Sequence, residues 1–139
     1  IENESGQTVS VLPLTEWGVP DYYELVLVTS EELADEQEDM VERFVRAMQR
    51  GYKAAEEDRE AAVQALLKAN TDAVEEVEMA SIELLWPYWT DEGQVAFGTQ
   101  TEENWERYAD WLKANGLLSE DVEADDAFTN DFVEAAAAD

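Results

Sequence analysis

A short aromatic and acidic cluster is the part of the sequence best suited to binding chemistry. Residues 17–24 include Trp17, Tyr22, Tyr23 and Glu24, and they lead directly into an apolar run. Aromatic faces stack on flat rings, and a carboxylate accepts hydrogen bonds from ring amino groups. The cluster therefore predicts a site for a flat, nitrogen-rich ligand. The alternative is that the aromatic side chains cover the end of a sheet while Glu24 stays in solvent.

Two further aromatic groups favour packing over binding. Residues 86–89 read WPYW and are followed by Gly93 and Phe97. We favour packing between helices around the proline for this group, and a cleft wall or lid is the alternative. The second group has the i, i+3, i+6 spacing that is typical of the buried side of a helix, and it consists of Trp105, Tyr108 and Trp111.

The composition excludes several kinds of catalytic and metal site. The 139 residues include no Cys and no His, so thiol nucleophiles, Ser-His-Asp triads and most transition-metal sites cannot be built from them. The glycines are scattered, and no phosphate-binding loop is present. Among 35 acidic residues no pair stands out as general acid and base. We expect no catalytic residue, metal or cofactor, and hence no enzyme.

The charge of the chain indicates in which solvent it works and which partners it excludes. Against the 35 Asp and Glu stand 8 Lys and Arg, which gives a formal net charge of -27, spread over nearly every segment. Phosphate backbones would repel such a chain, so we expect no nucleic-acid partner. A uniform acidic coat is typical of adaptation to molar salt and favours a haloarchaeal source. The alternatives are an acidic mesophilic domain or a calcium binder, although no EF-hand loop is present.

The hydrophobic pattern predicts a helix-rich α/β chain. Two strands are expected, at about 8–14 and at about 23–29, the second one apolar enough to be buried on both faces. Helices are expected over about 31–138. Ser30 is a predicted N-cap, Gly51 a predicted end for the first long helix, and Gly116 a predicted C-cap for a helix over 101–115.

Two strands do not make a sheet that covers its own edges. We therefore expect the chain to be the trailing part of a larger α/β protein, with any targeting signal removed or upstream. A chain of this kind that folds by itself is expected to pair with a second copy along the uncovered edge, as a homo-oligomer.

Several stretches, in order, resemble one family of proteins. The segment WGVPDYYELVLVTSEEL resembles solute-binding proteins of ABC importers in the thiamine-pyrimidine-precursor (thiamine pyrimidine synthase-like) family. Further similar stretches bring the resemblance to roughly residues 17–133, and they read VERFVRAMQRGYKAAEED, ALLKAN, ELLWPYWTDEGQ, WERYADWLKANGLL and AFTNDFV.

The resemblance implies a fold, a role and partners. It implies that residues 1–139 are the C-terminal portion of a two-lobed type II periplasmic-binding-protein fold whose N-terminal lobe is absent here. The implied role is capture of a thiamine-precursor pyrimidine, or a similar small heteroaromatic, and delivery to an ABC permease. The implied location is extracellular and membrane-tethered. Ligand-binding positions carried over by local motif are Trp17, Tyr22, Tyr23 and Glu24.

Two other functions remain open from the sequence. The family's relatives include an enzyme that makes the pyrimidine from its own active-site His and pyridoxal phosphate, and this chain has no His. The other alternative is a self-contained acidic helical interaction domain.

The acidic coat predicts that salt stabilises the fold. The Debye length shrinks from about 10 Å at 0.1 M to about 3 Å at 1 M, which screens most of the repulsion between carboxylates. We expect the melting temperature, followed by circular dichroism, to rise steadily from about 0.1 M to above 1 M salt. A melting temperature that stays flat over this range would contradict the halophilic interpretation.

Overall fold

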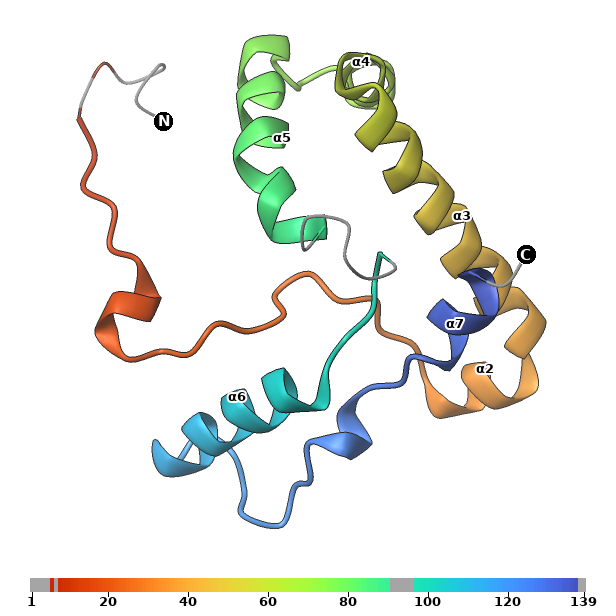
Figure 1. Cartoon of the computed structure of the whole chain (residues 1–139). Coiled ribbons are helices and arrows are strands. Elements are labelled where there is room, and N and C mark those ends of the chain that lie inside the picture. Colours follow the sequence, from red (N-terminus) through yellow and green to blue (C-terminus); the bar gives the residue numbers. More distant parts are fainter. Residues whose placement is uncertain (1–5, 7, 91–96, 138–139) are drawn as a thin grey trace. The chain divides into compact units, whose positions relative to one another are not determined.

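The computed structural model describes residue 6, residues 8–90 and residues 97–137, and these form helices and no strand (Figure 1). The elements, in chain order, are η1 (Leu14–Trp17), α2 (Glu31–Glu36), α3 (Glu38–Glu57), α4 (Arg59–Ala69), α5 (Glu75–Thr90), α6 (Glu102–Ala114), η3 (Asp125–Ala127) and α7 (Asp131–Ala137). The helix-rich character expected from the sequence is thus confirmed. None of the described helices is long and apolar enough to cross a membrane.

The chain divides into two compact units. Unit 1 combines the residues up to Leu27 with Thr101–Phe128, and it contains η1, α6 and η3. Unit 2 combines Val28–Gln100 with the residues from Thr129 on, and it contains α2 to α5 and α7. Each unit is therefore built from segments that are distant in sequence.

The two predicted strands are not formed among the described residues. Residues 8–13 and 23–29 are irregular, and Leu14 belongs to the short 3-10 helix η1 instead. A strand needs a neighbouring strand to pair its backbone groups, and neither segment has one here. As a result the apolar run is uncovered, with Leu25 81% and Val28 80% exposed. The prediction of an α/β sheet in this part of the chain was wrong for lack of that partner.

In unit 1, helix α6 has well-defined ends. Thr101 is the N-cap, and its Oγ1 accepts a hydrogen bond from the backbone N–H of Asn104. At the other end Gly116 has a φ of 69°, a conformation that favours glycine. The Leu117 N–H donates to the Leu112 carbonyl at 2.8 Å, and the Gly116 N–H donates to Lys113 at 2.9 Å. This pair of bonds is a Schellman motif, so the predicted C-cap at Gly116 is confirmed.

In unit 2, side-chain caps set the starts of α2 and α4, whereas α3 begins after Gln37 without such a cap. The Ser30 hydroxyl accepts from the Leu33 N–H at 3.1 Å, which confirms the predicted cap of α2. Asp58 caps α4 in the same way, by accepting from the Ala61 N–H at 2.9 Å. Gly51, however, lies inside α3, which runs on to Glu57, so the predicted end at that glycine was wrong. The apolar positions of α3 continue past it to Tyr52 and Ala55.

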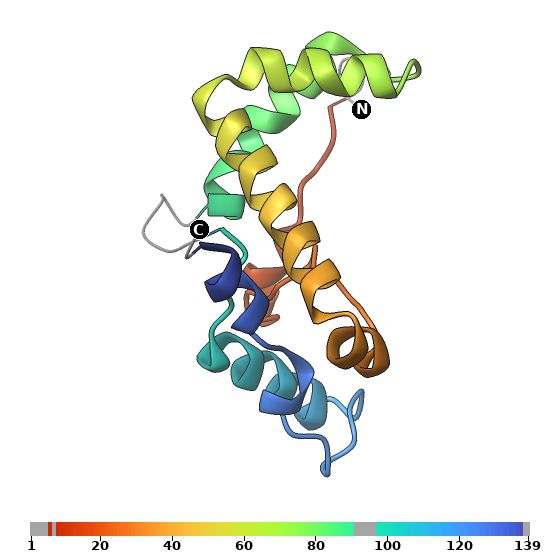
Figure 2. The ribbon, with the colours of Figure 1, turned by 90° about the vertical axis from the view of Figure 1, so that its right-hand side faces the viewer.

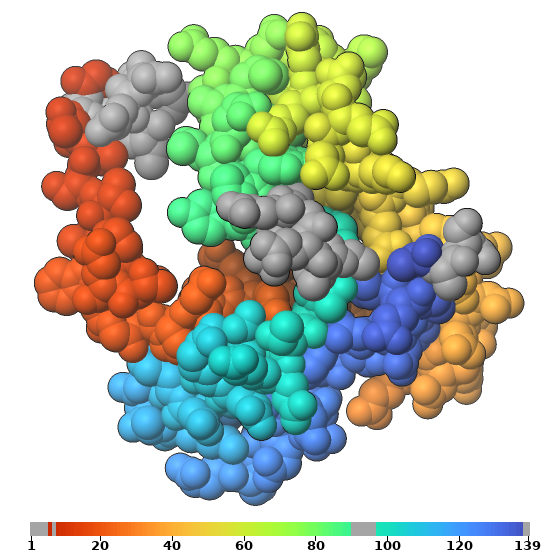
Figure 3. Space-filling model, viewed as in Figure 1, coloured from red at the N-terminus to blue at the C-terminus, as the bar shows by residue number. Residues whose placement is uncertain are grey.

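The core of unit 2 lies where α4 and α5 meet α3. Val63, Ile82 and Trp86 are its buried members, with exposures of 2%, 9% and 6%. In the space-filling view of this face, the green surface of α5 lies against the yellow surface of α3 and α4 (Figure 3). Trp86 therefore packs between helices, the favoured interpretation of the WPYW group. Helix α5 continues through Pro87 to Thr90, whereas Gly93 lies outside the described residues.

The other end of α3 packs against α7, and the two views agree in placing them side by side (Figures 1 and 2). Gln49 of α3 donates from Nε2 to the carbonyls of Phe97 and Val133, both at 3.3 Å. Asn130 and Gln100 form a reciprocal pair, in which the Gln100 N–H donates at 2.9 Å and the Asn130 Nδ2 donates back at 2.8 Å. These amide side chains join α7 and the 97–100 segment to α3 without using charge.

The burial pattern predicts which apolar residue of unit 2 matters most. We expect Val63→Ala to lower the free energy of unfolding by ~2 kcal/mol, because it removes two buried methyl groups and leaves a cavity. Leu84→Ala is the matched control, since Leu84 is 72% exposed. We expect the control to change stability by less than ~0.5 kcal/mol in the same urea titration. Equal losses in the two variants would contradict the placement of the core.

Candidate ligand-binding site

The segment around residues 19–24 lies against α6, and the first contact between them is aromatic. Tyr22 stacks on Tyr108, with ring centroids 4.5 Å apart and planes at 8°. Tyr108 in turn lies parallel to Trp111, at 6.1 Å and 5°. Stacked rings of this kind add to the apolar area that they bury. The aromatic positions of α6 thus hold this segment, as well as packing within the unit.

Tyr23 is joined to the start of α6 by its hydroxyl group. The Tyr23 oxygen accepts from the backbone N–H of Thr101 at 2.9 Å and from Nδ2 of Asn104 at 3.1 Å. Backbone N–H groups at the start of a helix lack acceptors within the helix. The Tyr23 oxygen is the acceptor for one of these groups, the N–H of Thr101. Its ring lies 5.9 Å from that of Trp105, which stacks on Phe128 at 5.8 Å. Tyr23 therefore has a fixed position within unit 1.

Arg107 provides the third link between this segment and α6. Its Nη2 donates to the backbone carbonyl of Asp21 at 3.3 Å and to Oδ1 of Asn104 at 2.6 Å. Asn104 thus donates to Tyr23 and accepts from Arg107. The resulting network fixes the backbone at residue 21 and the side chain at residue 23 to one turn of α6.

The other two predicted ligand-binding residues lie outside this network. Trp17 ends η1 with 70% of its surface exposed. Glu24 is exposed, and no described residue forms a hydrogen bond or ion pair with its carboxylate. The structure therefore brings Tyr22 and Tyr23 together on α6 and leaves Trp17 and Glu24 facing solvent.

Sequence reasoning missed the residues of α6 that complete this arrangement. Thr101, Asn104 and Arg107 contact a segment about 80 positions earlier in the chain, with separations of 78, 81 and 86 residues. Nothing in their local spacing signals such contacts. The spacing of the aromatic residues in α6 could be seen in the sequence. It indicated correctly that these residues pack, but it did not show which segment they pack against.

The electrostatics of unit 1 are those of an open acidic surface. Hydrogen bonds, chiefly from the Ser119 hydroxyl, lower the pKa of Asp121, with a smaller contribution from the charge of Lys113. Throughout the described part of the chain, no group of acidic side chains is arranged to hold a metal ion. The arrangement on α6 is suited to stacking and hydrogen bonding.

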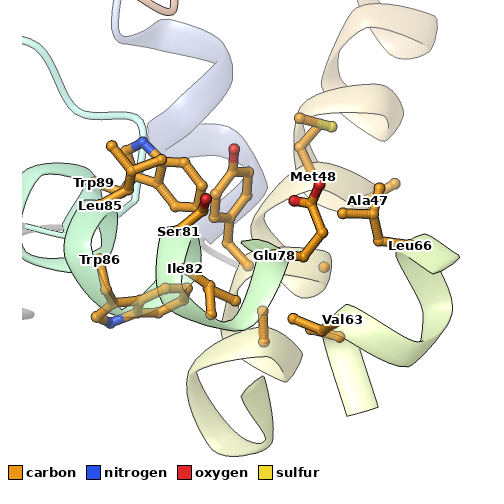
Figure 4. A pocket seen from close by; sticks show the side chains of 14 residues that line it. Ala47, Met48, Val63, Leu66, Glu78, Ser81, Ile82, Leu85, Trp86 and Trp89 are labelled. Atoms are coloured by element: carbon orange, nitrogen blue, oxygen red, sulfur yellow. The ribbon is translucent and has the colours of Figure 1, made fainter. Parts of the chain in front are cut away.

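A cavity of about 350 Å³ lies elsewhere, in unit 2, between α3, α4 and α5 (Figure 4). Its walls include Tyr52, Trp86 and Trp89, and none of the four predicted binding residues belongs to it. The molecule therefore offers an exposed aromatic segment in unit 1 and a concave aromatic pocket in unit 2.

Comparison with known proteins identifies relatives of the chain. Residues 1–62, which include Trp17 and Tyr22 to Glu24, match the family described as NMT1/THI5 like. The chain is also 33% identical, over 129 residues, to the formylaminopyrimidine-binding protein of Halalkalibacterium halodurans. Over these first 62 residues the chain is similar to the NMT1/THI5-like proteins. The resemblance to a thiamine-precursor pyrimidine-binding family that the sequence predicted is confirmed.

The alignment covers most of this chain but a much smaller share of the relative. The alignment with the formylaminopyrimidine-binding protein covers 90% of this chain but 39% of that relative. The chain thus spans well under half the length of this curated relative. No solved structure matches the chain significantly.

The network on α6 predicts unequal roles for two adjacent tyrosines. We expect Tyr23→Phe to lower the free energy of unfolding by about 1–2 kcal/mol, because the Thr101 N–H and Asn104 Nδ2 lose their acceptor. Tyr22→Phe is the control, since Tyr22 contributes a stacked ring and no described residue bonds to its hydroxyl. Chemical denaturation of both variants tests this. A larger loss in the Tyr22 variant would contradict the assignment.

Proposed function

We propose that the chain is part of the solute-binding component of an ABC importer and captures a thiamine-precursor pyrimidine or a similar small heteroaromatic. The observation that carries the proposal is the 33% identity to a formylaminopyrimidine-binding protein over 90% of the chain. Because that relative is named for binding, we prefer a binding role to synthesis of the pyrimidine, and the protein would perform no reaction on its ligand.

The chemistry of residues 17–24 supports this class of ligand. An aminopyrimidine offers a flat ring and amino groups that donate hydrogen bonds. Trp17 has an exposed indole face for stacking, and Glu24 has a carboxylate without a partner among the described residues. Tyr22 and Tyr23 are anchored on α6, and they fix the backbone between Trp17 and Glu24. In this proposal Trp17 and Glu24 contact the ligand, while Tyr22 and Tyr23 add ring surface.

The remaining parts of the proposal concern the whole protein. By resemblance, two lobes close on the ligand, and the closed form docks on a membrane permease outside the cell. A second lobe would supply further ligand contacts and a strand to cover residues 23–29. The whole protein would be extracellular and tethered to the membrane.

A fluorescence titration tests the ligand and the site together. The chain, in molar salt, is titrated with 4-amino-5-hydroxymethyl-2-methylpyrimidine while tryptophan emission is recorded. We expect saturable quenching that disappears in Trp17→Phe. Glu24→Gln is expected to weaken binding about tenfold or more, because a charged acceptor is lost.

Glu16→Gln provides the control for this titration. It removes the same charge from the exposed 3-10 helix η1 next to Trp17, and we expect less than a twofold change. If both glutamine variants weakened binding equally, the effect would be one of general charge and the assigned role of Glu24 would be wrong. A folded chain that showed no response would place the pyrimidine site outside residues 17–24.

A further inference from the structure

The cavity of unit 2 has the dimensions of a small-molecule site. Its volume of about 350 Å³ falls within the range of ~300–1,000 Å³ that ligand pockets occupy. Three helices, α3, α4 and α5, form its walls, and their apolar side chains provide most of its surface (Figure 4).

The aromatic end of the cavity is held in place by ring contacts. Tyr52 stacks on Phe97, with centroids 3.7 Å apart and planes at 21°. The edge of Tyr52 meets Trp89 at 5.8 Å and 87°, and Trp89 meets Trp86 at 6.3 Å. A wall whose side chains are already ordered costs little conformational entropy when a ligand binds. This end of the cavity is therefore preorganised for an apolar or aromatic group.

The opposite end of the cavity carries an acidic group. Glu78 and Ser81 line the cavity, and Figure 4 shows both side chains directed into the space between α3 and α5. Glu78 is half-buried, and no described residue forms an ion pair or hydrogen bond with its carboxylate. A partly buried carboxylate beside apolar surface favours a cation as its partner.

A cation is already bound by comparable groups on the same helix. The guanidinium of Arg59 lies 5.0 Å from the ring centre of Trp86, and its Nη1 donates to Glu83 at 2.6 Å. One ring and one carboxylate of α5 thus share a cation. The net charge of -27 further raises the local concentration of cations and repels anions.

The geometry points to the shape of the ligand. Glu78 and Trp89 are separated by eleven positions on α5, and a rise of 1.5 Å per residue places them about 16 Å apart along its axis. A compact ring does not reach both ends. We propose that the cavity binds an elongated primary amine, with the ammonium group at Glu78 and an apolar or aromatic body between Tyr52 and Trp89. This site is independent of the pyrimidine site proposed in unit 1.

A comparison of two ligands and three proteins tests this proposal. The probes are 8-phenyloctylamine, which is a cation at pH 7 and whose extended chain is long enough for this span, and its neutral counterpart 8-phenyloctanol. Binding to the chain is followed by isothermal titration calorimetry and by the indole N–H signals of Trp86 and Trp89 in two-dimensional NMR spectra. We expect the amine to bind at least about tenfold more tightly than the alcohol, and both ligands to shift the two indole signals.

Two near-isosteric variants test which carboxylate is responsible for the preference for the amine over the alcohol. Glu78→Gln is expected to abolish the preference for the amine, whereas Glu76→Gln, at an exposed position on the same helix, should retain it. Because both variants remove one negative charge, the general attraction of an acidic chain cancels between them. Circular dichroism confirms that each variant is folded. A preference that survives in Glu78→Gln, or folded protein whose indole signals neither ligand shifts, would overturn the proposal.

Discussion

The excess of acidic residues is the constraint on which the rest of the structure depends. With a net charge of -27, extended networks of ion pairs cannot hold the chain together. Most of the contacts described between distant segments are instead made by rings and neutral amides, and Arg59 and Arg107 add further ones. In unit 1, Tyr22 packs on Tyr108, and in unit 2, Tyr52 packs on Phe97. Such contacts do not weaken when salt screens charge, so the fold relies on interactions that remain strong in a salty solvent.

Signals confined to a few neighbouring residues were predicted correctly from the sequence. Ser30 accepts from an N–H three positions on, and Gly116 adopts the conformation that a helix end requires. The predicted helix end at Gly51 was wrong because a glycine is tolerated within a helix whose apolar face continues beyond it, at a cost of about 1 kcal/mol. The apolar run at 23–29 has strand composition, but a strand also needs a neighbour that the sequence pattern of this chain does not supply.

The candidate sites were predictable only in part, because they depend on distant segments. The aromatic types of Tyr22 and Tyr23 marked their segment, yet their partners on α6 follow about 80 positions later, as for Tyr23 and Asn104 with a separation of 81 residues. Glu78 could not be singled out among 35 acidic residues, since only its place in the wall of the cavity between α3, α4 and α5 distinguishes it. Composition thus indicates the chemistry that is available, and packing selects the residues that perform it.

Arg59 and Arg107 each join segments that are distant in the sequence, and this limits how the chain can change over evolutionary time. Arg59 contacts a ring and a carboxylate at once, and Arg107 joins a backbone carbonyl to an amide. A lysine offers a single ammonium point charge and lacks the planar fork that reaches two such partners. Gaining one more surface acid should matter little, whereas exchanging either guanidinium would remove contacts between distant segments of its unit. Substitutions are therefore expected to be tolerated more readily at acidic surface positions than at these two arginines.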